Sequence, residues 1–483
     1  MGKKLDKFFG ISAAGSNVRT EIIAGIVTFL AMAYILVVNP NQIAGSDAAL
    51  HESVFVATAL GAIVGTLLMA FLAKLPLAQA PGMGLNSMVG GLIGGWGAFQ
   101  CTFGNAMLMV FISGVLFLLL SIITVKGISI RELIFDGMPA SVRGAISVGI
   151  GLFIAFIGMQ NAGFIVKNEY TLVALAPFAT WDMAQVGPAL VCLIGLLIIA
   201  VLDQLKVKGS VIIGIVVAAA VGIPLGVTTW SGASWAFWER FANYFSFDPS
   251  NGGAFLAAFT GGLEWSSFPV MGFIMTIITF CMIDMFDTMG TVVGCCVPVG
   301  LADENGKPFN YDKIMVSDSV ATCAGALFGT STVTTFVESG SGIGAGGRTG
   351  MTALVVALLF LVSIFLYPLI SSIPSAACAS ALIYVGSLML KGIKNLKIDS
   401  AKEAVPAFLT IAMMPLAYSI TTGIGFGVLS YVVIDLIDYI VSSIKYAASS
   451  KKEEMEKPVW DLSVVTIVVA LLFIVYFFVP TVV

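Results

Sequence analysis

The chain has 483 residues, of which 58% are hydrophobic and only 10% are charged, and its mean hydropathy is +1.02. Soluble domains contain roughly 45–50% apolar residues, so this composition excludes a soluble globular protein and indicates a polytopic membrane protein. The formal net charge of −4 points to no particular partner, and no nucleic-acid partner is expected.

Apolar stretches of about 20 residues, the length that crosses a bilayer, recur along the whole chain. We expect an all-α polytopic membrane protein of about fourteen segments. A further apolar stretch at 462–479 follows the charged linker 445–457, and the sequence leaves open whether it spans the membrane. The fourteen segments are expected near residues 21–39, 54–73, 79–97, 105–125, 143–160, 187–203, 209–227, 267–290, 314–329, 332–347, 350–370, 376–390, 404–419 and 421–443.

Positive charges test this topology, because Lys and Arg accumulate in cytoplasmic loops. With the N-terminus inside, all of the 23 Lys and Arg residues except Lys167 and Arg240 fall on the cytoplasmic side. We therefore expect a multi-pass protein of the cytoplasmic (inner or plasma) membrane with a cytoplasmic N-terminus. Residues 1–16 lack the apolar core and cleavage site of a signal peptide, so none is expected.

Seven segments precede a long polar stretch and seven follow it, which is the pattern of an inverted repeat. The third segment of each half supports this, since LPLAQAPGMGLNSMVGG (Leu75 to Gly91) and STVTTFVESGSGIGAGGRTG (Ser331 to Gly350) both pass from an extended-looking run into glycine-rich sequence. We expect a short half-strand and then a short helix in segments 3 and 10, meeting at the midplane. The expected divisions are a first repeat at 1–227, an extracellular or periplasmic loop at 228–266, an inverted second repeat at 267–443, and a cytoplasmic linker with the additional apolar segment at 444–483.

A carboxylate, Glu338, lies where the β-branched run of segment 10 meets its glycines. Lipid tolerates neither an ionised side chain nor unpaired backbone amides, so this segment must be buried in protein or face a wet cavity. Secondary transporters bind their substrates at such broken helices, and we therefore expect a carrier with Glu338 and its neighbours Val337 and Ser339 in the site. The alternative is that Glu338 caps the following helix, and the two roles are compatible.

Two further acids lie deep in the eighth segment. Asp284 and Asp287 are three residues apart and share one helix face, and Thr291 follows Asp287 by four. We expect Asp284 and Asp287 to divide substrate binding and proton coupling between them, with Glu338 and Thr291 as further coupling candidates. The alternative is a structural role for either aspartate.

Segment 3 supplies the matching polar group, Asn86, whose amide can both donate to and accept from a heterocycle edge. Asn86 could instead only bridge helices. Gly84 is expected to let backbone approach the ligand, and Phe336 to stack on a planar ligand unless it serves packing. Asp203 and Asp318 are expected to be structural.

No cofactor or metal site is expected. The seven cysteines are scattered and lack a CxxC or His partner, so they are expected to pack as small core residues. No GxxxxGK[ST] sequence follows the glycine runs, which argues against nucleotide binding.

Three motifs together resemble the nucleobase–cation symporter family, and within it the azaguanine-type (AzgA-like) permeases for adenine, guanine and hypoxanthine. They are QAPGMGLNSM (Gln79 to Met88), MFDTMGTVVG (Met285 to Gly294) and TTFVESGSGIGAGGRTG (Thr334 to Gly350), and the resemblance extends to about Val441. It implies fourteen segments in two inverted repeats, a core and a gate domain, and a purine site between segments 3, 8 and 10, with protons as the coupling ion. It also implies that the eighth-segment acid is Asp284 or Asp287, the tenth-segment acid Glu338 and the third-segment polar group Asn86.

The resemblance also narrows the alternatives. Uracil and xanthine carriers of the wider family often have Glu followed by His or Asp four residues later, where this chain has Asp287 and Thr291, which favours the purine branch. An anion (sulfate- or bicarbonate-type) carrier of the same fold is the closest rival, but three acids near the site repel anions. A membrane-embedded enzyme lacks support because HExxH and GxSxG are absent, and a channel lacks a ring of ligands. The sequence leaves open the preferred purine, which acid carries the proton, proton against sodium coupling, and the oligomeric state, a homodimer included.

Overall fold

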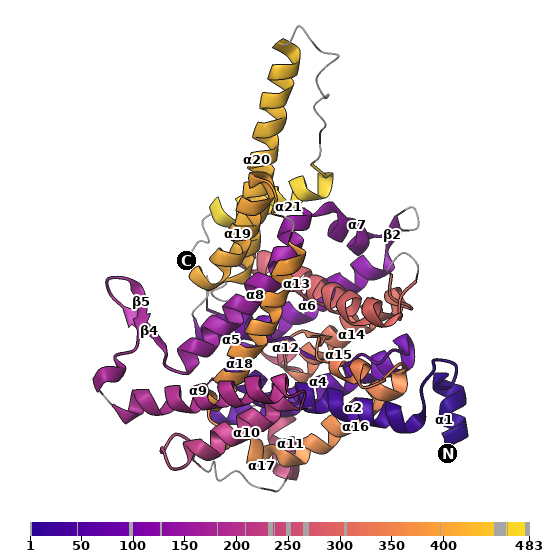
Figure 1. Cartoon of the computed structure of the whole chain (residues 1–483), viewed down its shortest axis with the longest axis vertical. Coiled ribbons are helices and arrows are strands. Elements are labelled where there is room, and N and C mark those ends of the chain that lie inside the picture. The colour runs from indigo at the N-terminus through magenta and orange to yellow at the C-terminus, as the bar shows by residue number, and fades with distance from the viewer. Residues whose placement is uncertain are drawn as a thin grey trace. The chain divides into compact units, whose positions relative to one another are not determined.

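The computed structural model describes residues 2–45, 47–95, 100–125, 128–180, 182–207, 209–229, 235, 237–247, 253–263, 270–303, 307–396, 398–448, 460 and 462–478. Helices dominate these residues (Figure 1). The strands among them form three separate antiparallel pairs. The linker expected at 445–457 lies outside the described residues from 449 onward, and the loop expected at 228–266 is described only in part.

The described helices and strands follow one another in this order: α1 (Gly2–Phe9), α2 (Val18–Met32), α3 (Ile35–Ala44), α4 (Ala48–Leu68), the π-helix η1 (Met69–Ala73), β1 (Gln79–Pro81), α5 (Met83–Gly94), α6 (Phe103–Ile122), β2 (Thr124–Val125), β3 (Ile128–Ser129), α7 (Ile130–Gly137), α8 (Ala140–Asn161), β4 (Ile165–Asn168), β5 (Leu172–Leu175), α9 (Met183–Gln204), α10 (Ser210–Gly222), α11 (Phe237–Tyr244), α12 (Ala257–Thr260), α13 (Val270–Cys296), α14 (Tyr311–Phe328), β6 (Val333–Thr335), α15 (Ser339–Gly344), α16 (Gly350–Ser363), α17 (Tyr367–Ile370), α18 (Ser375–Met389), α19 (Ala401–Leu416), α20 (Ile420–Ala448) and α21 (Val464–Phe478). Short 3₁₀ turns (η2, Phe178–Thr180; η4, Val297–Val299; η5, Ile364–Leu366; η6, Leu390–Asn395) join several of them.

Each of the fourteen expected segments overlaps a described helix. Nine are long and apolar enough to cross a membrane within the described part of the chain. The other five are shorter or less apolar: β1 with α5, then α10, α14, β6 with α15, and α19, which contains two prolines. The expected all-α polytopic class is therefore confirmed.

Chain contacts divide the protein into two compact units. Unit 1 comprises residues 1–122, 154–268 and 276–385, and unit 2 comprises residues 123–153, 269–275 and 386–483. The expected repeat boundaries at 227 and 267 concern internal symmetry rather than compactness, so they stay predictions.

Two half-strands pair inside unit 1. β1 and β6 run antiparallel with Gln79 opposite Thr335 and Pro81 opposite Val333, and the helices α5 and α15 begin just beyond them. Gly82 permits this close pairing, because a Cβ at that position would lie 2.5 Å from the Thr334 methyl group. The half-strands expected in segments 3 and 10 are confirmed, and their pairing satisfies backbone groups that lipid could not.

The first segment is also broken. α2 ends at Met32 and α3 starts at Ile35, and the turn between them contains Tyr34, whose side chain is fully buried. α15 packs along α2, and a Cβ on Gly342 would overlap the Thr28 hydroxyl and lie 2.6 Å from the Ala24 carbonyl oxygen. The first segment therefore packs directly against α15, the half-helix of the tenth segment.

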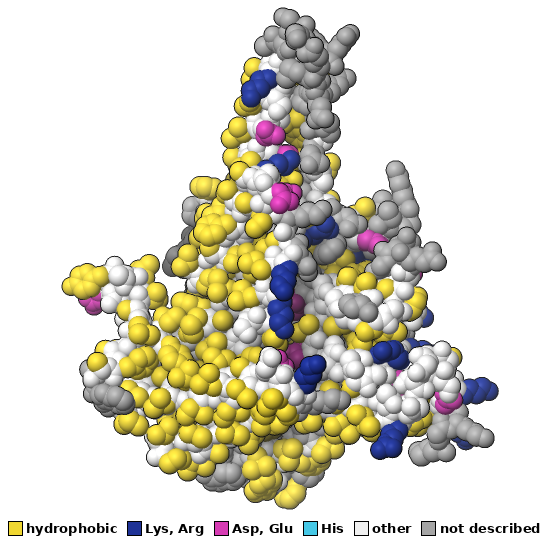
Figure 2. Space-filling view, in the orientation of Figure 1, with side chains coloured by type: hydrophobic (Ala, Val, Ile, Leu, Met, Phe, Trp, Pro, Cys, Tyr) yellow, Lys and Arg dark blue, Asp and Glu magenta, His cyan; other side chains and the backbone are white. Residues whose placement is uncertain are grey.

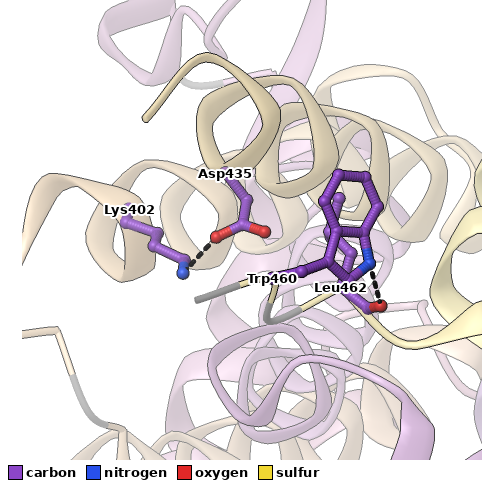
Figure 3. A network of polar contacts seen from close by, with 4 residues as sticks. All are labelled: Lys402, Asp435, Trp460 and Leu462. Carbon is purple, nitrogen blue, oxygen red and sulfur yellow. Dashed lines mark hydrogen bonds and ion pairs between the residues drawn. The ribbon is translucent and has the colours of Figure 1, made fainter. Parts of the chain in front are cut away.

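In unit 2, α21 (Val464–Phe478) lies within the expected apolar stretch 462–479 and packs against α20 and α7. The hydroxyls of Ser463 and Thr466 both donate to the Gly137 carbonyl at the end of α7, at 2.7 and 2.6 Å. Figure 3 shows the approach to this helix, where the Trp460 indole donates to Leu462 O at 2.9 Å and Lys402 pairs with Asp435. α21 is therefore a docked part of unit 2.

Exposed apolar side chains cover the outer helices of unit 1. Leu197 and Val201 on α9 are 56% and 57% exposed, and Val216 on α10 is 54% exposed. Figure 2 shows hydrophobic side chains over much of the face around these two helices. An apolar surface of this kind is suited to contact with the hydrocarbon core of a bilayer.

Candidate functional site

Glu338 directly precedes α15 and is the third residue after the paired strand β6. Its backbone is helical and its side chain makes no capping hydrogen bond, so the alternative helix-capping role is absent from the structure. Instead, the Tyr34 hydroxyl donates to Glu338 Oε1 at 2.7 Å. Glu338 is half-buried, whereas Tyr34 is fully buried.

Asp287 lies on α13 close to this pair. It interacts electrostatically with Glu338 and Tyr34, and its carboxyl lies near the Thr334 hydroxyl of β6. Asp287 is half-buried, like Glu338. We call Asp287 and Glu338 the open carboxylates, since both retain exposed surface.

Two other carboxylates are enclosed. Asp284 on α13 and Asp318 on α14 are 1% and 0% exposed, and we call them the enclosed carboxylates. Asp284 Oδ2 accepts from the Thr322 hydroxyl at 2.7 Å. Asp318 accepts at Oδ1 from Gln79 Nε2 at 2.5 Å and the Thr335 hydroxyl at 3.2 Å, and at Oδ2 from the Thr288 hydroxyl at 2.8 Å.

None of the four carboxylates forms an ion pair with a lysine or arginine within the described residues. Hydroxyl groups and one side-chain amide donate hydrogen bonds to them. No cluster of three or more His, Cys, Asp or Glu residues suited to a metal ion occurs in the described ranges. The site is thus an acceptor-rich surface without a fixed counter-charge among these residues.

Asn86 is fully buried in the second turn of α5. Its Nδ2 donates to Pro81 O at 3.3 Å, and its Oδ1 accepts from the Ser331 hydroxyl. The amide therefore joins α5 to the end of β1 and to Ser331, two residues before β6. These two contacts do not bridge helices, and contact of Asn86 with a ligand stays a prediction.

The remaining expected site residues surround the strand–helix junctions. Ser339 is buried and its hydroxyl accepts from Ala78 N–H at 3.0 Å, so it ties segment 10 to segment 3. Phe336 is 6% exposed, whereas Val337 is 52% exposed. Gly84 is buried in the first turn of α5, and Thr291 is half-buried one turn beyond Asp287.

Several residues of this network were not foreseen as site residues. Nothing in the sequence marks Tyr34 as a site residue, because an aromatic residue within an apolar run is usually a packing residue. Asp318, expected to be structural, accepts three hydrogen bonds. The sequence does contain a pattern that could have identified Asp318, because the D-x-x-x-T spacing of Asp284 to Thr288 recurs at Asp318 to Thr322.

Known proteins resemble this chain over most of its length. A permease family model (Xan_ur_permease) matches residues 19–426. The adenine permease AdeQ of Escherichia coli K12 is 38% identical over 427 residues, covering 88% of this chain and 89% of AdeQ. The guanine/hypoxanthine permease PbuO of Bacillus subtilis 168 is 37% identical over 428 residues, covering 88% of this chain and 93% of PbuO.

Among solved structures, the transmembrane domain of the cyanobacterial bicarbonate transporter BicA aligns with a TM-score of 0.60 and 16% identity, covering 84% of this chain and 97% of that domain. At this identity the likeness concerns the fold alone. It confirms that the described helices share the fold of that domain.

Proposed function

This chain belongs to the permease family that its residues 19–426 match, and on that premise we propose that it imports purine nucleobases by proton symport. Permeases move solutes across membranes, so the protein is a multi-pass transporter and not an enzyme, as the sequence led us to expect. The substrates we propose are adenine, guanine and hypoxanthine, which are named for relatives 37–38% identical to this chain. The membrane we propose is the cytoplasmic one, with the N-terminus inside.

The observation that carries the substrate proposal is the pair of open carboxylates beside the paired half-strands. Glu338 and Asp287 are half-buried acceptors that lie close enough to interact electrostatically. A purine presents ring and exocyclic N–H groups, and a carboxylate accepts two such bonds side by side. We therefore assign the N–H edge of the purine to Glu338 and a second contact to Asp287.

Other groups complete the proposed pocket. Asn86 and the backbone at Gly84, Val337 and Ser339 supply donors and acceptors where α5 and α15 begin. Phe336 would stack on the flat ring. Of the two α13 acids, Asp287 takes the binding role and Asp284 the coupling role, while Thr291 is a weaker coupling candidate. Transport then proceeds by alternating access around this site.

An anion carrier is the second candidate, because BicA shares the fold and is named for bicarbonate. The four carboxylates oppose it, since an anion placed among them meets like charges without a paired cation in the described residues. A uracil or xanthine carrier of the same family would use the same acceptors.

Uptake of labelled hypoxanthine by cells that express the chain tests the substrate. We expect accumulation above vector controls that unlabelled adenine, guanine and hypoxanthine suppress and that bicarbonate and sulfate leave intact. A protonophore should abolish accumulation, and removal of sodium should not. Suppression by uracil or xanthine alone, or by the anions, would contradict the proposal.

A further inference from the structure

The N-terminal helix α1 places charged and apolar side chains on different faces. Lys4 and Lys7 are exposed, whereas Leu5 and Phe9 pack against the protein. Phe9 is 6% exposed and belongs to a buried cluster with Met351 of α16, and α1 also contacts α2. A basic helix with one apolar face is typical of helices that lie along a membrane surface.

Aromatic contacts fix the depth at which α1 lies. The apolar span Ala49–Ala73 ends in η1, where the ring of Phe71 lies 6.0 Å from the rings of both Phe8 and Phe9. Lys74 directly follows this span, and its Nζ lies 5.3 Å from the centre of the Phe8 ring. Because α1 contacts the last turn of the span and the cation that ends it, α1 lies where the hydrocarbon core of a bilayer meets the headgroups.

Large apolar side chains remain uncovered at this depth. Phe8 is 53% exposed, Phe71 is 46% exposed and Leu72 is 39% exposed. Their exposure to water would cost hydrophobic free energy in proportion to the apolar area. Contact with the first acyl carbons of a lipid would remove that area from water.

Four exposed cations occur on α1 and at the adjoining ends of the first two spans: Lys4, Lys7, Arg19 and Lys74. None of the four forms an ion pair within the described ranges of the chain. The acid of α1, Asp6, accepts hydrogen bonds from the N–H and the hydroxyl of Ser12 at 2.7 and 2.8 Å. In Figure 2, Lys and Arg side chains gather near the place where Figure 1 draws α1. Positive charge therefore predominates around the uncovered rings.

We propose that α1 and the adjoining ends of the first two spans bind the headgroups of anionic phospholipids. The lysines and Arg19 contact the phosphate groups, and Phe8 contacts the first acyl carbons. With the N-terminus inside, this surface faces the cytoplasmic leaflet, whose anionic lipids attract clustered Lys and Arg. The proposal goes beyond the transport of purines and does not depend on the identity of the substrate.

Thermal unfolding of the purified full chain tests the proposal. The chain in a neutral detergent is titrated with palmitoyl-oleoyl-phosphatidylglycerol, which is anionic, and separately with the zwitterionic phosphatidylcholine of the same acyl chains. We expect phosphatidylglycerol to raise the melting temperature at a much lower concentration than phosphatidylcholine does. A lysine near an anionic lipid surface contributes roughly a fivefold gain in affinity. Lys4→Gln/Lys7→Gln/Lys74→Gln should therefore need on the order of a hundredfold more phosphatidylglycerol, with the phosphatidylcholine titration unchanged.

Lys391→Gln/Lys394→Gln is the matched control, because it removes two exposed lysines of η6 in unit 2. It should respond to phosphatidylglycerol as the wild type does. If the triple variant is not monodisperse, Lys4→Gln/Lys7→Gln replaces it, and the expected shift is about twenty-five-fold.

Three outcomes would overturn the proposal. The first is a triple variant that responds to phosphatidylglycerol as the wild type does. The second is a wild type that both lipids stabilise equally. The third is equal stabilisation by inorganic phosphate, which would assign these cations to a soluble anion instead of a lipid.

Discussion

The hydroxyl of Tyr34 donates to Glu338 Oε1 at 2.7 Å across 304 residues of sequence. The bond joins the break in the first membrane segment to the start of the half-helix in the tenth. Tyr34 is fully buried, so its hydroxyl has little access to water as an alternative partner. The orientation of Glu338 is therefore set by a neutral donor, which leaves the carboxylate free of a permanent counter-charge.

Tyr34→Phe should weaken purine binding while the protein still inserts and folds. The change removes one donor to the Glu338 carboxyl, and hydrogen bonds to charged groups contribute about 1.5–3 kcal/mol, so KM should rise roughly tenfold or more. The maximal rate should change much less, because the site remains assembled. Initial rates of labelled hypoxanthine uptake over a concentration series measure both.

Tyr244→Phe is the matched control, since Tyr244 is also fully buried and donates to a backbone oxygen, Phe328 O, at 2.9 Å. It should leave KM as in the wild type. Equal KM values for Tyr34→Phe and the wild type would show that Tyr34 does not position Glu338.

Gly342→Ala should destabilise the protein and reduce uptake. The new methyl group would overlap the Thr28 hydroxyl and approach the Ala24 carbonyl oxygen to 2.6 Å, which forces α15 away from α2. Overpacking of this kind costs about 1–3 kcal/mol. Gly344→Ala, in the same helix, meets nothing within 4 Å and should be tolerated. Detergent thermostability of both variants checks the contrast, and equal melting temperatures would contradict the packing of α15 on α2.

Glu21→Gln should lower thermostability. Glu21 is fully buried and its carboxylate accepts from the N–H groups of Arg348, Thr349 and Thr352 at 3.0, 3.3 and 3.2 Å. In the glutamine variant, the amide NH₂ group would lie against these N–H donors and leave buried groups without a hydrogen bond. The free energy of unfolding should fall by about 1–3 kcal/mol. Glu403→Gln, a half-buried acid in the first turn of α19, is the control and should have little effect. A melting temperature for Glu21→Gln equal to that of the control would contradict the role of Glu21 as a buried acceptor for these N–H groups.

Sequence reasoning foresaw the elements that follow from local pattern. The apolar spans indicate membrane helices by their length and composition. The extended runs at Gln79 and Val333 and the isolated charge at Glu338 contradict a continuous membrane helix, so general physical chemistry is enough to identify them. The acid pair at Asp284 and Asp287 was visible for the same reason.

The partners of these residues could not be predicted, because they come from distant segments. In the sequence, Tyr34 resembles any other aromatic residue of an apolar span. Its hydrogen bond to Glu338 appears only in the folded structure, where the turn of the first segment lies beside that carboxylate. Asp284 and Asp287 look equivalent on one helix face, yet the structure encloses the first and leaves the second half-buried. That difference depends on where α14 and β6 pack, which no local pattern encodes.

Uptake of labelled hypoxanthine by cells expressing Glu338→Gln, at membrane levels matched to the wild type, tests the central claim most directly. The amide keeps the size of Glu338 but replaces one acceptor oxygen with a donor, so it can no longer accept two N–H bonds from a purine. We predict uptake at the vector background, with Asp203→Asn retaining wild-type rates. Wild-type uptake by Glu338→Gln would contradict the assignment of Glu338 as the purine-binding carboxylate.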